Sequence, residues 1–336
     1  MKAAVVGIEG TELTPAEAKL MLTHQPAGII LFGRNIEGAL SLARLIGDLR
    51  EVLPPGGQLM VDQEGGRVAR LRPPDWTTQP AAGLVGAIYD VDHAAGLRLA
   101  WLTGALIGVE CREAGFDVVC APVLDLLVAG ATSAIGDRAY GPDPDRVSAL
   151  AQSMADGLLS AGIQPVGKHI PGHGRARVDS HDELPFVGAD EDLTPDIDVF
   201  TQCANLPWMM TAHIIYAGLD PARPATLSPK IIEELIRGDI GFDGVLISDD
   251  LAMGALSGTP GERVKASIAA GCDLALHCSG RMKDNEAVLK AAPQVSVAAR
   301  TRMQRAASLA ARCQLSLDRE ALVADQTDLL TAVLAE

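Results

Sequence analysis

The sequence predicts a single-domain α/β protein, folded as a closed (β/α)8 barrel. Eight short apolar runs recur along its 336 residues, and segments with helical periodicity separate most of them. Alternating β and α segments are typical of parallel strands joined by crossover helices. Eight such repeats favour a closed barrel over the alternative that the pattern leaves open, a doubly wound open sheet.

The expected elements follow one another along the chain. The strands cover residues 3–8, 28–32, 58–61, 117–123, 163–167, 208–213, 244–248 and 273–278. Helical periodicity is clear at 15–23, 40–52, 94–114, 144–160 and 229–236, and again in two closing helices at 298–312 and 319–334. No linker rich in Pro, Gly or Ser divides the chain, so we expect one domain over residues 1–336, with the helices of about 296–334 packed on the barrel.

Composition narrows the class of protein. Hydrophobic residues make up 48% of the chain but aromatic residues only 3%, which predicts a large aliphatic core. A formal net charge of −15 disfavours binding to nucleic acid or to anionic lipid. No apolar run reaches the roughly 18 residues that a membrane span needs. We therefore expect a small-molecule partner, no nucleic acid and no membrane, and we expect a monomer.

The cysteines and the first residues indicate a compartment. The six cysteines form no Cys-x-x-Cys pair, and several lie within apolar runs, so they are expected to be buried thiols in a reducing compartment. Residues 1–7 look like a first strand and not like a signal peptide. A cytoplasmic enzyme fits both observations.

In a (β/α)8 barrel the active site lies at the carboxyl ends of the strands. Polar residues follow nearly every expected strand here: Asp62 follows the third, Lys168-His169 the fifth and Ser248-Asp249-Asp250 the seventh. Charged groups therefore converge on one face of an otherwise aliphatic barrel. No rule of folding requires that pattern, so it predicts a functional site.

The stretch 166–181 is the densest in titratable groups. His169, His173 and His181 fall there with two arginines, a lysine and an aspartate, and Pro171 with two glycines excludes a helix. One histidine alone, such as His173, could be purely structural. The whole cluster at a strand end indicates chemistry carried by a loop.

Two parts of the sequence suit catalysis. Asp249 ends a strand and faces the barrel mouth, where it can act as a nucleophile or base, while Asp250 can cap a helix that begins after the strand. In Asp179-Ser180-His181, a carboxylate bonded to the imidazole would fix its tautomer, and such a pair can exchange a proton near neutral pH. Ser180 lacks the elbow motif of a triad nucleophile.

A third group suits binding. Asp62, Arg67 and Arg70 surround a glycine turn, and Arg138 lies on the long loop after the fourth strand. Lone arginines are usually solvated, but these lie where a barrel presents its ligand-binding side chains. A carboxylate with cations and amide donors is typical of sites for vicinal hydroxyls, which predicts a polar, hydroxyl-rich substrate.

These motifs together resemble a known family. The run Lys168-His169-Ile170-Pro171-Gly172-His173-Gly174, followed by Asp179-Ser180-His181, is similar to the signature of glycoside hydrolase family 3 β-N-acetylglucosaminidases, and most similar to their single-domain bacterial NagZ type. Further matches occur in the family's order between about residues 5 and 290, at 28–32, 62–68, 121–125, 135–138, 213–216, 227–230 and 247–251.

The resemblance implies a TIM barrel that removes terminal β-linked N-acetylglucosamine with retention of configuration, using no cofactor and no metal. It implies a role in recycling cell-wall muropeptides in the cytoplasm. By matching motifs, Asp249 is the nucleophile and His181 the general acid/base, supported by Asp179. Most retaining glycosidases use two carboxylates, and this subgroup replaces one with histidine. The residues implied to hold the sugar are Asp62, Arg70, Arg138, Lys168 and His169.

The chain departs from the family pattern at three places. Gly254 stands where the family usually has an acid, and Ile170 stands where Phe is common. Asp182-Glu183 makes the segment after His181 more acidic than usual, which could change how the loop closes.

Two other functions compete with the glycosidase. In a metal-dependent barrel hydrolase, His169, His173, Asp179, His181 and Asp249 could ligate zinc, although no His-x-His pair ends the first strand. A non-catalytic sugar-binding barrel would bind its ligand without turnover. The complete set of Asp249, Asp179 and His181 argues against that second alternative.

Overall fold

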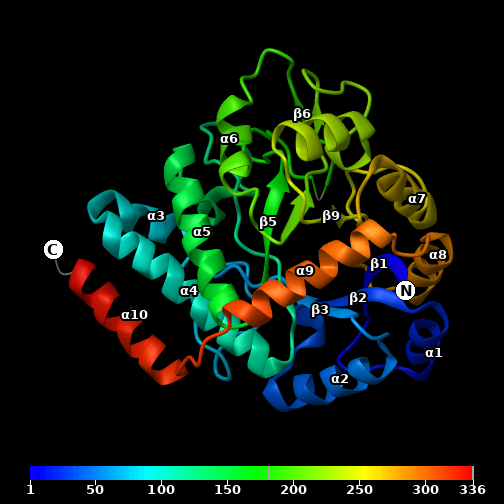
Figure 1. Ribbon diagram of the computed structural model, residues 1–336, viewed down its shortest axis with the longest axis horizontal. Coiled ribbons are helices and arrows are strands. Elements are labelled where there is room, and N and C mark those ends of the chain that lie inside the picture. The colour runs from blue at the N-terminus through cyan, green and yellow to red at the C-terminus, as the bar shows by residue number, and fades with distance from the viewer. Residues whose placement is uncertain (181, 335–336) are drawn as a thin grey trace.

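Eight strands close into a parallel barrel in the computed structural model, which describes residues 1–180 and 182–334 (Figure 1). The prediction of a single-domain (β/α)8 barrel is therefore confirmed, and the doubly wound open sheet is wrong. In order around the barrel the strands are β1 (Lys2–Gly7), β10 (Leu274–His277), β9 (Val245–Asp250), β7 (Trp208–Thr211), β5 (Gln164–Ile170), β4 (Val118–Val119), β3 (Gln58–Val61) and β2 (Pro26–Leu31).

Helices surround this barrel (Figure 1). The α-helices are α1 (Pro15–His24), α2 (Ala39–Val52), α3 (Ala82–Val91), α4 (His93–Ala114), α5 (Pro144–Ser160), α6 (Thr194–Gln202), α7 (Pro260–Ala270), α8 (Met282–Ala291), α9 (Val297–Cys313) and α10 (Arg319–Leu334). Shorter helical segments are η1 (Gly33–Asn35), η2 (Gly136–Arg138), η3 (Ala225–Leu227) and the π-helical η4 (Ile231–Asp239). α3, α6, α7 and α8 lie outside the ranges that the sequence analysis named for helical periodicity.

Local sequence signals set the ends of several helices. α1 and α7 each begin with a capping box, formed by Thr14 with Glu17 and by Thr259 with Glu262, and each has proline at its first position. α4 ends at Gly115, whose φ of 99° lies in the left-handed region that glycine adopts without strain. The capping boxes thus mark where α1 and α7 begin, and Gly115 marks where the chain leaves α4 for β4.

Alternate side chains of the strands fill the barrel interior. Met60 of β3, Val166 of β5, and Val245 and Ile247 of β9 belong to one buried cluster inside the barrel. Side chains on a strand alternate between its two faces with a period of two. The next inward positions toward the carboxyl ends are therefore Asp62, Lys168 and Asp249. The strand period itself places a charged layer on top of the aliphatic layers.

Two C-terminal helices complete the fold. Ala299, Met303 and Ala306 of α9 join the same buried cluster as the inward-facing strand residues, and α9 contacts β5 and β9 (Figure 1, orange). α10 packs along α4 (Figure 1, red against cyan). Its Arg319 Nη2 lies 2.6 Å from Oε1 of the buried Glu110.

Three further differences from the sequence-based expectation concern β4, η4 and a second sheet. β4 is shorter than predicted because Ala121 donates its N–H to Val119 and Pro122 has no N–H to donate to the ladder. The helix expected at 229–236 is the π-helical η4. A second sheet, β6 (Phe186–Val187) paired with β8 (Ile215–Tyr216), was not expected, because two-residue strands carry no periodic signal.

α4 is long and apolar enough to cross a membrane by length and composition alone. The mean hydropathy of its 18-residue window is 1.3, but 67% of that window is buried inside the fold. α4 packs against α3, α5 and α10, which is the position of a core helix in the outer layer of the barrel.

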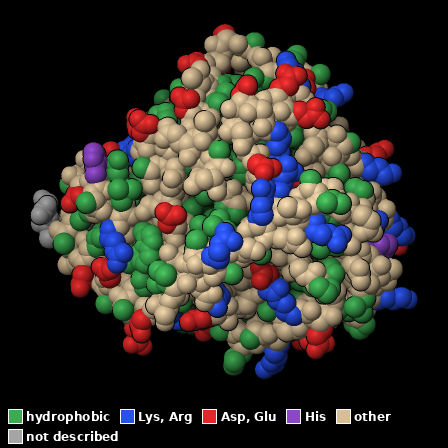
Figure 2. All heavy atoms as spheres, in the orientation of Figure 1, with side chains coloured by type: hydrophobic (Ala, Val, Ile, Leu, Met, Phe, Trp, Pro, Cys, Tyr) green, Lys and Arg blue, Asp and Glu red, His purple; other side chains and the backbone are tan. Residues whose placement is uncertain are grey.

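Acidic and basic side chains are interspersed over the face in Figure 2, so the surplus of negative charge is not gathered into one patch there.

α4 and α5 approach each other closely at glycines. A Cβ on Gly104 would lie 2.0 Å from the carbonyl oxygen of Met154, and a Cβ on Gly157 would lie 2.2 Å from that of Trp101. Both distances are shorter than any van der Waals contact. Glycine is therefore required here by packing, against its own poor helix propensity.

We expect Gly104→Ala to destabilise the fold by about 1–3 kcal/mol, because overpacking outweighs the roughly 1 kcal/mol gained in helix propensity. Gly47→Ala in α2 is the matched control, since a Cβ there meets nothing within 4 Å. That control should stabilise the protein by about 0.5–1 kcal/mol. Urea unfolding midpoints measure both changes. If Gly104→Ala proved as stabilising as Gly47→Ala, the close α4–α5 contact would be refuted.

Candidate active site

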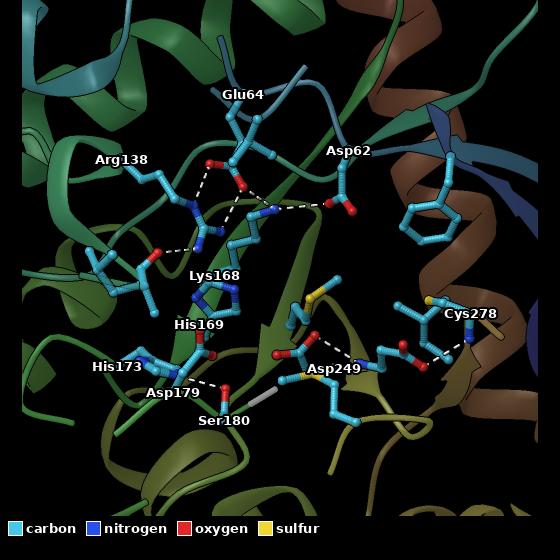
Figure 3. Close-up of a pocket in the computed structure, with 18 of the residues that line it drawn as sticks. Asp62, Glu64, Arg138, Lys168, His169, His173, Asp179, Ser180, Asp249 and Cys278 are labelled. Carbon is cyan, nitrogen blue, oxygen red and sulfur yellow. Dashed lines mark hydrogen bonds and ion pairs between the residues drawn. The ribbon is translucent and has the colours of Figure 1, made fainter. Parts of the chain in front are cut away.

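A cavity of about 220 Å³ opens among the carboxyl ends of the strands (Figure 3). It brings together seven of the eight side chains that the sequence singled out: Asp62, Arg70, Arg138, Lys168, His169, Asp179 and Asp249. The eighth, His181, lies outside the described residues. Phe32, Glu64, His173, Ser180, Met210 and Cys278 also line the cavity.

Lys168 lies at the centre of this charged layer. Its Nζ is 3.0 Å from Asp62 Oδ1 and 2.6 Å from Glu64 Oε1, and only 2% of the residue is exposed (Figure 3). Burial alone would lower the pKa of the Lys168 ammonium, but the two carboxylates outweigh burial and hold it well above its usual range. Lys168 is therefore a permanent cation in the floor of the cavity.

Glu64 is held by a second cation as well. Arg138 Nε and Nη2 each lie 2.8 Å from one oxygen of the Glu64 carboxylate, which is a bidentate contact. Burial would raise the pKa of Glu64, but Lys168 and Arg138 outweigh it and lower the value to about 2. Arg70 Nη2 lies 3.4 Å from Asp62 Oδ2 on the other side of the layer. The cations and carboxylates thus form one connected network.

Asp249 sits at the inward-facing end of β9, opposite this network (Figure 3). Its Oδ1 accepts the N–H of Asp250 at 2.8 Å. Burial would raise the pKa of Asp249, but the imidazoles of His169 and His213, the Asp250 N–H and Lys168 outweigh burial and lower it. Asp249 is therefore an ionised carboxylate at neutral pH, which is the state that a nucleophile or base requires.

Asp125 orients His169. Its Oδ2 lies 2.6 Å from His169 Nδ1, and its Oδ1 accepts the backbone N–H groups of His169 at 3.1 Å and His173 at 2.7 Å. Burial would raise the pKa of Asp125, but His169 and the His173 N–H outweigh it and lower the value to about 2. The ionised carboxylate only accepts, so His169 Nδ1 carries a proton and the ring is fixed toward the cavity.

His213 lies behind Asp249. Its Nε2 is 3.0 Å from the carbonyl oxygen of Asp250, so that nitrogen carries the proton, and its Nδ1 is 2.7 Å from Thr226 Oγ1. Burial lowers the pKa of His213 despite the neighbouring carboxylates. His213 therefore ties the end of β7 to the end of β9 as a buried imidazole.

Other expected residues have different surroundings. Arg67 contacts Asp137 and the carbonyl oxygens of residues 133–135, so it holds the loop that carries Arg138. Asp250 Oδ1 accepts the N–H groups of Ala252 and Cys278, so it caps a turn where a helix was considered.

Sequence reasoning missed three residues at the site: Glu64, Asp125 and His213. Glu64 stands two residues after Asp62, so the period of two could have placed both carboxylates on the same side of the chain. Asp125 and His213 stand at expected strand ends, but their partners lie 44 and 37 residues away along the chain, at His169 and Asp250.

Comparison with known proteins identifies the family. Residues 4–313 match the glycosyl hydrolase family 3 N-terminal domain. The chain belongs to glycoside hydrolase family 3. It is thus a glycosidase, and the resemblance inferred from its motifs is confirmed.

Individual relatives agree over most of the chain. A β-hexosaminidase from Alkalilimnicola ehrlichii is 41% identical over 287 residues, which cover 82% of this chain and 80% of that protein. A β-hexosaminidase from Pseudomonas aeruginosa is 37% identical over 306 residues, with 90% and 89% covered. The crystal structure of NagZ from Neisseria gonorrhoeae in complex with N-trifluoroacetyl-D-glucosamine has a TM-score of 0.83 and 31% identity, and the match covers 99% of this chain and 97% of that one.

We expect Glu64→Gln to lower the stability of the fold by about 3 kcal/mol near neutral pH, the free energy that corresponds to a pKa held at about 2 against 4.5. A carboxyl whose pKa is lower in the folded protein than in the unfolded chain stabilises the fold at pH values above its unfolded pKa. That stabilisation is lost as the pH falls through its folded pKa. The difference between wild type and variant should therefore shrink from about pH 4.5 toward about pH 2. Urea midpoints measured across this range test it. A difference that stays constant with pH would show that the Glu64 charge is not the cause.

Proposed function

We propose that the protein is a retaining exo-β-N-acetylglucosaminidase that removes terminal β-linked N-acetylglucosamine from muropeptides during cell-wall recycling. The observation that carries the proposal is the ionised Asp249 at the mouth of the barrel, facing a layer of buried cations and carboxylates. The β-hexosaminidase relatives and the glucosamine derivative bound by the gonococcal NagZ support the choice of sugar.

The first half of the reaction forms a covalent intermediate. An oxygen of Asp249 attacks the anomeric carbon, and the bond from that carbon to the glycosidic oxygen breaks. His181, assigned by the family motif and supported by Asp179, gives its proton to the departing oxygen. The sugar is then held as an ester of Asp249.

The second half releases the sugar. A water molecule attacks the anomeric carbon, and His181 takes one of its protons while the ester bond to Asp249 breaks. The product carries the hydroxyl on the same face as the original bond, so configuration is retained. Asp249 returns to its ionised state and His181 to its protonated state.

The charged layer suits the hydroxyl groups of the sugar. The carboxylate of Asp62 can accept hydrogen bonds, and Lys168, Arg70, Arg138 and His169 can donate them. Their mutual contacts fix these groups before the sugar arrives, so little reorganisation is needed when the transition state forms.

We also propose that the enzyme is cytoplasmic, as expected from its cysteines, and that it acts as a monomer. The described cysteines are free thiols; Cys111, Cys120, Cys203, Cys272 and Cys278 are buried and Cys313 is partly exposed. Buried free thiols fit a reducing compartment.

Metal dependence needs its own test, because one structure of the gonococcal NagZ is in complex with a zinc ion. Within residues 1–180 and 182–334, no group of three or more His, Cys, Asp or Glu side chains is arranged to hold a metal. A chromogenic β-N-acetylglucosaminide assayed with and without chelator separates the possibilities. Turnover that survives chelation supports the glycosidase mechanism above, loss of turnover on chelation supports a metal enzyme, and binding without turnover supports a sugar-binding barrel.

Asp249→Asn should lose turnover by roughly 10³-fold or more, because the amide cannot form the intermediate, while sugar binding is retained. A fluorinated sugar that traps the intermediate should label Asp249, and peptide mapping by mass spectrometry locates the label. Glu64 and Asp250 are the internal controls, because both are carboxylates lining the same cavity. Label found on either of them would overturn the assignment.

His181→Ala should harm substrates with poor leaving groups far more than activated phenols, since general acid help is worth about 10²–10⁴-fold and a phenolate of low pKa hardly needs it. Asp179→Ala should show the same selective loss in milder form. The kcat/KM values for a series of aryl β-N-acetylglucosaminides measure this dependence. An equal loss across the series would exclude the acid/base role.

A further inference from the structure

His173 lines the cavity but has no part in the chemistry proposed above. Its Nε2 lies 2.9 Å from Ser180 Oγ, and both residues are buried, with 3% and 2% of their surfaces exposed (Figure 3). Ser180 stands between Asp179 and His181, the two residues assigned to proton transfer. The contact therefore joins a fixed part of the barrel to the segment that carries the acid/base pair.

The His173 end of this contact is held firmly by the barrel. Its backbone N–H donates to Asp125 Oδ1 at 2.7 Å, and its ring meets the His169 ring edge-on, with centroids 5.6 Å apart. The preceding residue is also held, because the Tyr216 hydroxyl donates to the carbonyl oxygen of Gly172 at 2.7 Å. His173 thus has a defined position whether or not the rest of the loop moves.

The protonation state of the His173 ring allows it to donate a hydrogen bond to Ser180. Burial and the neighbouring His169 lower the pKa of the His173 ring to about 4, although Asp125 and Asp249 act in the opposite direction. Its Nδ1 is buried without a partner among the described residues. A proton on Nε2 leaves only a lone pair at Nδ1, whereas the other tautomer would bury an unpaired N–H. We therefore assign Nε2–H as the donor and Ser180 Oγ as the acceptor.

Ser180, the other partner in this hydrogen bond, lies at the end of a loop that makes few regular backbone contacts. The loop starts with Gly172 and Gly174, and it is held midway where Arg175 Nε donates to Asp196 Oδ2 at 2.6 Å. Beyond Ser180 the chain turns, because the N–H groups of residues 182 and 183 donate to the carbonyl oxygen of Asp179. A side-chain hydrogen bond at Ser180 fixes this turn against the cavity wall.

We propose that His173 is a positioning residue, whose hydrogen bond to Ser180 holds the chain at Asp179 and Ser180 against the cavity, next to the residue that the family motif assigns as the acid/base. The inference rests on the proposed function, since it assigns the segment a role in protonating that group. Loss of the contact should harm the step that needs the proton and leave sugar binding nearly intact.

Kinetics with matched variants test the role. Ser180→Ala removes the acceptor, His173→Leu removes the donor at similar volume, and His173→Gln keeps an N–H near the same place. Ser148→Ala is the control, because it deletes a buried serine hydroxyl in α5, away from the cavity. We expect Ser180→Ala and His173→Leu to lose about 10-fold in kcat/KM on poor leaving groups, as for one hydrogen bond, with little loss on activated phenols. His173→Gln should recover most of the activity.

The losses of activity caused by the two substitutions should also be non-additive. If the two side chains act through one contact, the double variant Ser180→Ala/His173→Leu should lose no more than the worse single variant. Additive losses, equal losses on good and poor leaving groups, or a His173→Gln variant as impaired as His173→Leu would each overturn the proposal.

Hydrogen exchange tests the contact without relying on activity. The peptide covering residues 174–185 should exchange faster in Ser180→Ala and His173→Leu than in wild type, with no change in Ser148→Ala. Unchanged exchange in both variants would overturn the proposal. If the wild-type protein showed no hydrolysis at all, the proposed function would fail, and the exchange result alone would still decide whether His173 holds the segment.

Discussion

The buried ammonium of Lys168, bonded to Asp62 and Glu64, is the interaction on which the site depends. A buried charge is strongly unfavourable unless it is paired and hydrogen-bonded, so β5 can carry a lysine into the barrel only where β3 supplies carboxylates. Six charges at the centre of the cavity balance one another. Asp62, Glu64 and Asp249 are the anions, and Arg70, Arg138 and Lys168 are the cations. Removing Lys168 would take a cation from both Asp62 and Glu64 at once.

This balance also fits the sugar substrate that we propose. Glu64 is fully engaged by Lys168 and Arg138, so it shapes the layer and leaves substrate contacts to its neighbours. Asp249 is different, because the contact that fixes it is the N–H of Asp250 on Oδ1. Among the described residues Asp249 forms no ion pair, although nearby imidazoles and Lys168 lower its pKa, and a carboxylate without an ion pair retains the nucleophilicity that such a pair would reduce. The proposed nucleophile therefore stands apart from the paired cations and carboxylates that are proposed to bind the sugar.

The sequence predicted the parts of the molecule that depend on local patterns. The eight barrel strands, the helices α1, α2, α4, α5, α9 and α10, and the strand-end residues Asp62, Lys168 and Asp249 follow from periodicities of two and 3.6 and from the rule that barrel sites lie at strand ends. The roles of the catalytic residues came from the family motif and remain predictions. What the sequence could not show are partnerships between distant segments. Glu64 meets Lys168 only because β3, β4 and β5 are neighbours in the closed barrel, and β6 pairs with β8 through tertiary contacts alone.

The central claim is that Asp249 forms a covalent bond to the sugar, and the configuration of the first-formed product tests it most directly. Proton NMR of a β-N-acetylglucosaminide during its hydrolysis distinguishes the two anomers before they equilibrate. Two displacements at the anomeric carbon, the first by Asp249, predict that the β anomer appears first. Initial release of the α anomer would mean a single displacement by water, and it would contradict the account of Asp249 as a nucleophile.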